Sequence, residues 1–394
     1  MWLRNDGIRD LNITGMWSCA QWGDTLLGLR ADQMSIAVGD SARIWMRFTP
    51  EHNVYYRLPV VVATDGPDGF VALQFEAQGR WSQSYYSSTE NKSWAQLKSA
   101  LTTKLNQGTT NLGYNGARDQ MYGNLDNVNG QVTCIYTGRV ATFNTRAGAT
   151  ANNFNCEHTF PQSLFSSAEP MKSDIHHLFP CDESANTQRS NNPFGIITGT
   201  PAWSVGGSKR LSGVFEPRDA HKGDAARAMM YFVTRFGDYS SFYAQQAAVL
   251  EAWHQQFPPD SADRARNQGI AALQNTRNPY VDYPQIMERL ISLAGSPQPN
   301  LAAQHWASED TLELELWSWS VGPMLRRRLV VTNPGSDDLI LGAASLSAPN
   351  VNLIAGGNAD TLKPGELHVY EIEYPASVVH DGGSLSYTVS TGGT

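Results

Sequence analysis

The residues of this chain that could carry chemistry gather in one short segment. Glu157 and His158 are adjacent, and Asn186 and Arg189 follow in a short helix candidate, DESANTQRSN. A neutral imidazole can accept a proton from water near pH 7. Carboxylate and amide oxygens form the hard site that Mg²⁺ prefers, and the planar fork of an arginine binds phosphate. Together these groups indicate metal-assisted hydrolysis of a phosphodiester.

The elements around these residues must place them on one surface. Successive side chains of a strand point to opposite faces, so Glu157 and His158 share a surface only where the strand ends. Pro161 predicts that the β-like run ends there. Asn186 and Arg189 are three residues apart, which puts both on one face of the predicted helix. We therefore expect a strand end beside a short helix.

Other polar residues of the segment are expected to support the site without binding the metal. Asp174 fits a helix cap or an orienting carboxylate, and for His176 a structural hydrogen bond and a role in the site stay open. His177 and Asn191 are further candidates for such support.

The segment resembles the endonuclease I family, bacterial secreted or periplasmic nucleases with a His-metal (ββα) finger. The matching runs are EHTFP, DIHHLFP and NTQRSNNPF, and AHKGDAARAMMYF, YYSSTENKSWAQLKSAL and TCIYTG are similar. The resemblance covers residues 82–295. His177 is a departure, because some relatives have Asn there.

By position, the resemblance implies that His158 is the general base and that Glu157 and Asn186 bind one Mg²⁺. Mn²⁺ and Ca²⁺ are the alternative metals. Arg189 would bind the phosphate beside the cleaved bond. The implied substrate is DNA, with RNA as an alternative, cut with little sequence preference to give 5′-phosphates.

Two other functions compete with this interpretation. A zinc hydrolase could use His158, His176 and His177 with Glu157, although the H-E-x-x-H spacing of zinc peptidases is absent. A non-enzymatic surface adhesion protein is suggested by the β-rich flanks, but it leaves the grouping of Glu157, His158 and Asn186 unexplained.

Charge is distributed unevenly along the 394 residues. The chain has a net charge of −8, which by itself disfavours a polyanionic partner. Residues 82–300 contain 18 Lys and Arg against 17 Asp and Glu, a net charge of +1, so the flanks together carry −9. The middle of the chain is therefore free to bind an anion.

Two of the four cysteines, Cys156 and Cys181, lie within the candidate site segment. A disulfide between them would brace the site and imply an oxidising compartment. Two separate buried thiols are the alternative. No C-x-x-C spacing occurs, which disfavours a structural zinc site.

The chain is expected to be multidomain, with a central α+β nuclease domain over residues 81–297 between two all-β flanks. Residues 1–80 and 301–394 show alternating, β-branched runs bounded by Asp-Gly turns. Both resemble Ig-like modules of the abnormal-spindle/hydin type and share a strand–turn–strand repeat. LELELWSWSVG, residues 312–322, is the predicted first strand of the second copy. The first copy lacks that strand, which suggests a longer natural chain.

Helical spacing predicts helices over residues 93–108, 220–239, 240–257 and 282–295, and a β-like segment over 133–143. A linker is expected over 294–303. No apolar run is long enough for a membrane span. No signal peptide is visible, so a mature or trimmed form of a secreted or periplasmic protein is expected, with a protein or surface partner for the flanks.

Overall fold

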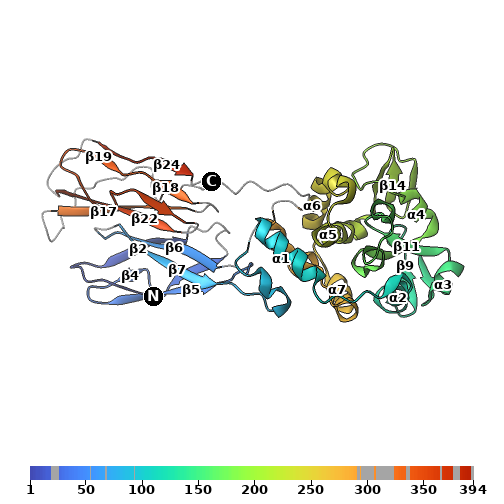
Figure 1. Cartoon of the computed structure of the whole chain (residues 1–394). Helices are drawn as coiled ribbons and strands as arrows, with labels where there is room; N and C mark the ends of the chain where they lie inside the picture. The colour runs from blue at the N-terminus through green and yellow to red at the C-terminus, as the bar shows by residue number, and fades with distance from the viewer. Residues whose placement is uncertain are drawn as a thin grey trace. The chain divides into compact units, whose positions relative to one another are not determined.

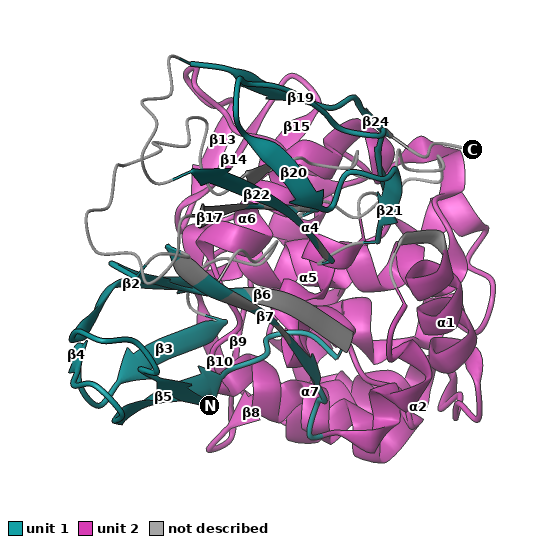
Figure 2. Cartoon of the chain, turned by 90° about the vertical axis from the view of Figure 1, so that its left-hand side faces the viewer, with its two compact units in different colours: residues 1–82, 299–394 teal, residues 83–298 magenta. Residues whose placement is uncertain are grey.

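The computed structural model describes residues 1–18, 26–53, 55–66, 69–92, 94–290, 293, 306–307, 324–333, 338–363, 366–375 and 382–391. The predicted strand over 312–322 lies outside these residues, and so does the predicted linker. The chain divides into two compact units, Met1–Ser82 with Pro299–Thr394, and Gln83–Gln298 (Figure 2). The flanks thus share one unit, and their identity as two separate Ig-like domains stays a prediction.

The unit of residues 83–298 is α+β, as predicted (Figure 1). Its helices are α1 (Trp94–Asn106), α2 (Gly113–Gln120), α3 (Arg146–Ala151), α4 (Glu183–Arg189), α5 (Asp219–Phe236), α6 (Ala247–Gln256), α7 (Ser261–Gln274) and α8 (Pro279–Asp282). Its strands are β8 (Asn127–Val128), β9 (Gln131–Thr133), β10 (Val140–Thr142), β11 (Phe154–His158), β12 (Leu178–Asp182), β13 (Trp203–Val205), β14 (Ser208–Leu211) and β15 (Val214–Glu216). They form the small antiparallel sheets β10-β9-β8, β11-β12 and β13-β14-β15.

Helix α5 is the centre of this unit, with α1 and α6 around it (Figure 1). Almost all of its residues from His221 to Arg235 are buried. Gly223 permits a close approach, because a Cβ there would lie 2.4 Å from the carbonyl oxygen of Phe257. The small residues Ala225, Ala226 and Ala228 are buried as well, so neighbouring elements can pack closely against the helix.

Two local expectations differ from the structure. Residues 282–295 were expected to form a helix, but the described part contains a 3-10 helix, η8 (Pro284–Arg289), and Leu290 is extended. The segment 133–143 is not one strand, because a turn separates β9 from β10. Helix α7 was not predicted, although Asp260 and Asp263 form a capping box at its start.

The other unit consists of small antiparallel sheets. Its strands are β1 (Trp2–Arg4), β2 (Leu11–Ser18), β3 (Leu27–Ala31), β4 (Ser35–Ile36), β5 (Ser41–Phe48), β6 (Tyr55–Thr64), β7 (Phe70–Gln78), β16 (Trp306–Ala307), β17 (Met324–Thr332), β18 (Leu339–Leu341), β19 (Ser345–Ser347), β20 (Asn352–Ala355), β21 (Asp360–Leu362), β22 (Leu367–Pro375), β23 (Ser384–Ser386) and β24 (Val389–Thr391). The N-terminal strands form the sheets β1-β5-β3 and β4-β2-β6-β7. Ile44 of the first sheet and Val62 of the second belong to one hydrophobic cluster, so these sheets pack face to face.

The repeat predicted from the sequence has a structural counterpart in two buried asparagines. The backbone N–H of Asn5 donates to the carbonyl of Asp40, just before β5. The N–H of Asn333 donates in the same way to Glu366, just before β22. Each asparagine also uses its side-chain amide to bind a backbone carbonyl. Buried polar groups need such partners, which explains why both copies have Asn at this turn.

Among the described residues, no helix combines the length and the apolar character that a membrane crossing requires.

Candidate functional site

The candidate site is built on the hairpin β11-β12 and the helix α4 that follows it. The register pairs Phe154 with Asp182 and His158 with Leu178, so β11 ends at His158, as expected from the sequence. Helix α4 begins at Glu183, directly after β12. An acidic residue in its first turn and Arg189 in its last turn complement the helix dipole. The segment therefore contains two antiparallel strands followed by a helix, as the resemblance implies.

Asn186 and Glu157 lie on the side of β11 that α4 covers. The Nδ2 of Asn186 donates to Oδ1 of Asn155 at 2.8 Å, and Asn155 is two residues before Glu157, hence on the same face of the strand. Because its amide nitrogen is engaged there, Oδ1 of Asn186 is the atom left to bind a cation.

Glu157 is 2% exposed, and its carboxylate has two partners. The hydroxyl of Tyr136 donates to Oε1 at 2.8 Å, and Nε of Arg189 lies 3.3 Å from the same oxygen. Burial raises the pKa of Glu157, whereas Arg189 and Tyr136 oppose that rise. Oε2 has no hydrogen-bond partner within the described part of the chain, so this oxygen is available to a metal ion.

His158 has surroundings different from those of Glu157. Its Nε2 lies 3.1 Å from the carbonyl oxygen of Lys172. A carbonyl can only accept, so Nε2 bears the hydrogen and Nδ1 retains the lone pair. Burial, together with the nearby His177, lowers the pKa of His158 to about 3, so the ring is neutral at pH 7. Within the described chain, the side-chain contacts of His158 and those of Glu157 involve different residues.

Three residues beside His158 were not found from the sequence. The ring of Tyr114 lies 5.5 Å from that of His158, measured between centroids. The Arg118 guanidinium lies 4.1 Å from the Tyr114 centroid, and the Lys172 ammonium lies 4.9 Å from it. Neither cation has a carboxylate partner within the residues that the structure describes. Tyr114 and Arg118 precede His158 by some forty residues, so no local pattern announces them.

Asp174 has the capping role expected from the sequence. It accepts a hydrogen bond from the backbone N–H of His176 at the start of η5 (Ile175–His177). Its carboxylate also binds Arg235 at 2.5 Å and the hydroxyl of Tyr231 at 2.9 Å. Burial alone would raise the pKa of Asp174, but Arg235 holds it below the ordinary value. This buried pair connects the turn before β12 to helix α5.

His176 and His177 each bind a backbone carbonyl through Nε2, that of Thr276 at 3.1 Å and that of Met171 at 2.7 Å. Burial lowers the pKa of both, for His176 to about 4. The His177 ring also lies 5.5 Å from the His158 ring, and its Nδ1 is buried without a partner among the described residues. His177 thus touches the site, whereas His176 holds the neighbouring backbone.

Arg189 and Asn191 occupy unlike environments. Arg189 is 1% exposed, and its guanidinium donates to the carbonyls of Thr159 at 2.6 Å and Ser190 at 2.9 Å. Asn191 is exposed and donates to Oγ of Ser163 at 2.8 Å, in the 3-10 helix η3 (Gln162–Phe165) that follows β11. In this arrangement Arg189 neutralises Glu157 and fixes the strand end, and its predicted contact with phosphate stays a prediction.

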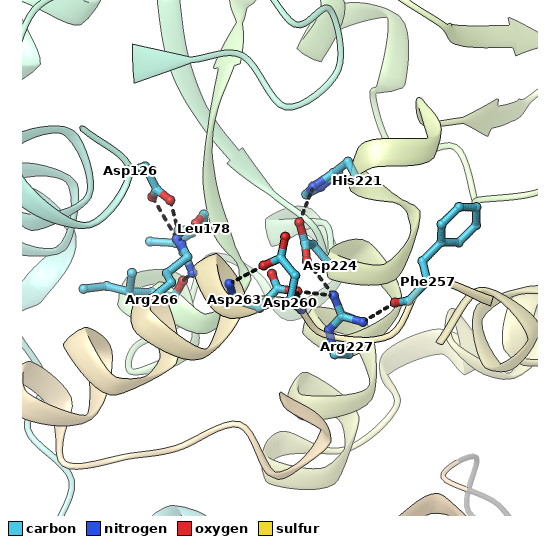
Figure 3. A network of polar contacts seen from close by, with 10 residues as sticks. Asp126, Leu178, His221, Asp224, Arg227, Phe257, Asp260, Asp263 and Arg266 are labelled. Carbon is cyan, nitrogen blue, oxygen red and sulfur yellow. Dashed lines mark hydrogen bonds and ion pairs between the residues drawn. The ribbon is translucent and has the colours of Figure 1, made fainter. Parts of the chain in front are cut away.

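A polar network behind the hairpin holds β12 and α5 in place (Figure 3). Arg266 of α7 donates to the carbonyl of Leu178, the residue paired with His158, and forms an ion pair with Asp126. Arg227 of α5 binds both Asp224 and Asp263, and it donates to the carbonyl of Phe257 (Figure 3). Both arginines bind backbone carbonyls as well as carboxylates, and Arg266 fixes the strand opposite His158.

Comparison with known proteins places this site in a family. The endonuclease I family matches residues 93–285. An extracellular ribonuclease of Bacillus amyloliquefaciens is 30% identical over 227 residues, which is 52% of this chain and 76% of the relative. That of Bacillus subtilis (strain 168) is 31% identical over 222 residues, 51% and 76% of the two chains. This chain belongs to the endonuclease I family. An extracellular deoxyribonuclease of Aeromonas hydrophila is 33% identical over 117 residues, 28% of this chain and 50% of the relative.

Endonuclease I nucleases generally use a divalent metal, and the donors present here fit one. Oε2 of Glu157 and Oδ1 of Asn186 are hard oxygens without hydrogen-bond partners in the described chain. Mg²⁺ commonly binds one or two protein oxygens and keeps several water molecules. A group of three His, Cys, Asp or Glu residues able to hold a metal does not occur among the described residues. The two donors are therefore oxygens, the ligand type that hard divalent cations prefer.

The register of this endonuclease I hairpin does not bring Cys156 and Cys181 together. Cys181 is paired with Asn155, one position away from Cys156, so the two thiols point to opposite faces of the hairpin. Both are free and buried, and so is Cys134. The Sγ atom of Cys181 instead lies 3.9 Å from that of Cys134. Of the two alternatives that the sequence left open, the Cys156–Cys181 disulfide is absent, and two separate buried thiols describe the structure.

Proposed function

We propose that the chain is a secreted or periplasmic Mg²⁺-dependent endonuclease that hydrolyses DNA and RNA with little sequence preference. The observation that carries this proposal is the end of β11. There a neutral imidazole with a free Nδ1 lies next to a strand residue, Glu157, whose carboxylate shares a surface with the amide of Asn186. Relatives named as extracellular ribonucleases and deoxyribonucleases support both substrates and the location.

In the proposed reaction, Nδ1 of His158 accepts a proton from the attacking water. The carbonyl of Lys172 fixes the ring orientation and favours the imidazolium that forms, because Nε2–H already donates to it. Glu157 and Asn186 would hold the Mg²⁺ ion, which stabilises charge on the phosphate and on the leaving 3′ oxygen. In-line attack by water then leaves the phosphate on the 5′ end of the product.

Arg189 and Tyr136 act on Glu157 in this proposal. Both contact Oε1, which leaves Oε2 free of them, and both oppose the rise in the pKa of Glu157 that burial causes. Tyr114, Arg118 and Lys172 form a cationic edge beside His158 that suits the substrate phosphates. Arg189 could bind the substrate phosphate in this proposal only if its ion pair with Glu157 breaks when the metal binds.

A plasmid-nicking assay with and without EDTA tests the proposal. His158→Ala should lower the rate by about 10²–10⁴-fold, the usual loss for a positioned base. His368→Ala is the matched control, because that histidine binds Asp360 in the other unit. Asn186→Ala should raise the Mg²⁺ concentration needed for half-maximal rate, whereas the exposed Asn124→Ala should not. Equal rates for His158→Ala and the wild type would show that the base is another group.

The contacts of the three histidines that a zinc hydrolase would need disfavour this alternative. The Nε2 atoms of His158, His176 and His177 bind three different backbone carbonyls, so these three nitrogens are already engaged. Stoichiometric zinc in the purified protein, with peptidase activity independent of Mg²⁺, would favour it. The adhesion alternative does not account for membership of a nuclease family.

A further inference from the structure

The N-terminal sheet β1-β5-β3 presents an outer surface that the proposed active site does not use. Leu3, Ala42 and Ile44 point into the hydrophobic core, so the alternating residues of the same strands point outward. We call these outward residues the Trp–Arg face; they are Trp2, Arg4, Arg30, Arg43, Trp45 and Arg47. Nothing in the core requires two indoles on this side of the sheet.

The residues of the Trp–Arg face alternate across the strands. Trp2 is directly opposite Arg43, and Arg30 is directly opposite Trp45. The guanidinium of Arg43 lies 3.6 Å from the Trp45 centroid and 5.8 Å from that of Trp2. Trp2 and Trp45 are therefore diagonal neighbours, roughly 7–8 Å apart along a sheet. That spacing suits two bases of an extended single strand.

The side chains of this face are open to a ligand. Trp2 is 65% exposed and Trp45 is 42% exposed, unusually high values for the largest apolar side chain. Arg30, Arg43 and Arg47 form no ion pair with any carboxylate within the described chain. Arg30 and Arg43 each lie against an indole ring on a neighbouring strand, and such contacts could account for arginine at these two positions. Arg47 is opposite Gly28 and touches no ring there. A role in stabilising the sheet therefore does not explain why position 47 is an arginine.

The electrostatics of the face favour a polyanion. Arg4 is paired with Asp6 at 2.7 Å, and Asp32 accepts a hydrogen bond from the backbone N–H of Arg43. The guanidinium groups of Arg30, Arg43 and Arg47 have no carboxylate partner among the described residues, although the whole chain has a net charge of −8. Aromatic faces stack with any nucleobase, and arginines bind the phosphates between them.

We propose that the Trp–Arg face binds single-stranded nucleic acid, with bases stacked on Trp2 and Trp45 and phosphates on Arg30, Arg43 and Arg47. The choice of nucleic acid over another polyanion rests on the proposed nuclease function. A single strand is favoured over a duplex because a duplex conceals its base faces. The face would keep a substrate strand attached to the enzyme between cleavage events.

Binding of a fluorescent oligo(dT) by the full chain in EDTA tests this proposal without cleavage. Trp45→Ala should weaken binding about tenfold, the loss expected for one stacked base, and Trp45→Phe should restore part of it. Arg43→Gln with Arg47→Gln should lower the slope of log affinity against log salt by about 0.7 for each arginine. The matched control is Arg146→Gln with Lys363→Gln, which removes two charges that are already paired with carboxylates.

Hydrolysis of a small chromogenic phosphodiester separates this proposal from the proposed function. Face variants should hydrolyse it at the wild-type rate, because none of the substituted side chains belongs to the proposed active site. Unchanged oligo(dT) affinity in the Trp45 and arginine variants would overturn the Trp–Arg face proposal and leave the nuclease proposal intact. Tighter binding of a duplex, or of a sulfated polysaccharide of equal charge, would also overturn it. A wild type that binds oligo(dT) but hydrolyses no phosphodiester would overturn only the proposed function.

Discussion

The replacement Arg189→Gln separates a structural from a phosphate-binding role for this arginine. Arg189 and Glu157 are both almost fully buried, and Nε lies 3.3 Å from Oε1. The guanidinium also donates to the carbonyls of Thr159 and Ser190. Removing one member of a buried pair typically costs about 3–5 kcal/mol, because the remaining charge loses its partner. Whole domains are stable by only about 5–15 kcal/mol, so this loss should be plainly visible.

Urea unfolding of the full chain, followed by near-ultraviolet circular dichroism, measures that loss. Arg189→Gln should lower the midpoint of the transition assigned to residues 83–298. Arg210→Gln should change it little, since Arg210 is half-buried and donates to a neutral partner, Oε1 of Gln188. The double variant Glu157→Gln with Arg189→Met should be more stable than Arg189→Gln alone, because no charge is left buried without a partner.

A different outcome would refute this reasoning. Suppose Arg189→Gln unfolds at the wild-type urea concentration and raises the KM for plasmid DNA in a salt-dependent manner. The guanidinium would then contact the substrate, and its burial against Glu157 would not describe the working enzyme. The predicted phosphate role of Arg189 would be correct in that case.

Three further predictions concern the same unit. Gly223→Ala should destabilise it by about 1–3 kcal/mol in thermal unfolding, because the new Cβ would lie 2.4 Å from the carbonyl oxygen of Phe257. Gly116→Ala is the control, because its Cβ would meet only ordinary contacts. Arg118→Gln should raise KM about tenfold at constant kcat, because it removes a cation beside His158. Arg146→Gln should not raise KM, because Arg146 is paired with Asp119, and an unchanged KM for Arg118→Gln would contradict the proposed cationic edge. Burial and the adjacent Asp224 raise the pKa of Asp263 to about 7, so the stability that this group contributes is complete below about pH 4 and is lost as the pH rises to about 7. Asp263→Asn should remove that decline, and parallel stability–pH curves for the two proteins would contradict the shift.

Local sequence patterns were sufficient for the hairpin–helix segment and for several of the helices. The strand before His158 ends where Pro161 predicts, and Asp174 caps the next turn because its short carboxylate reaches the N–H two residues on. Helix α5 follows from apolar spacing over residues 220–239. These features depend on neighbours within a few residues, so periodicity and capping rules suffice for them.

Tertiary structure decided what surrounds each candidate residue. It placed Tyr136 and Arg189 on the carboxylate of Glu157, and Arg118 beside His158, across separations that no local pattern spans. It also separated Cys156 from Cys181, because a shift of one residue in strand register moves a side chain to the other face. The types and spacing of the residues therefore determined the candidate chemistry. Packing determined which groups are buried in pairs and which oxygens and nitrogens stay available to a metal ion and a substrate.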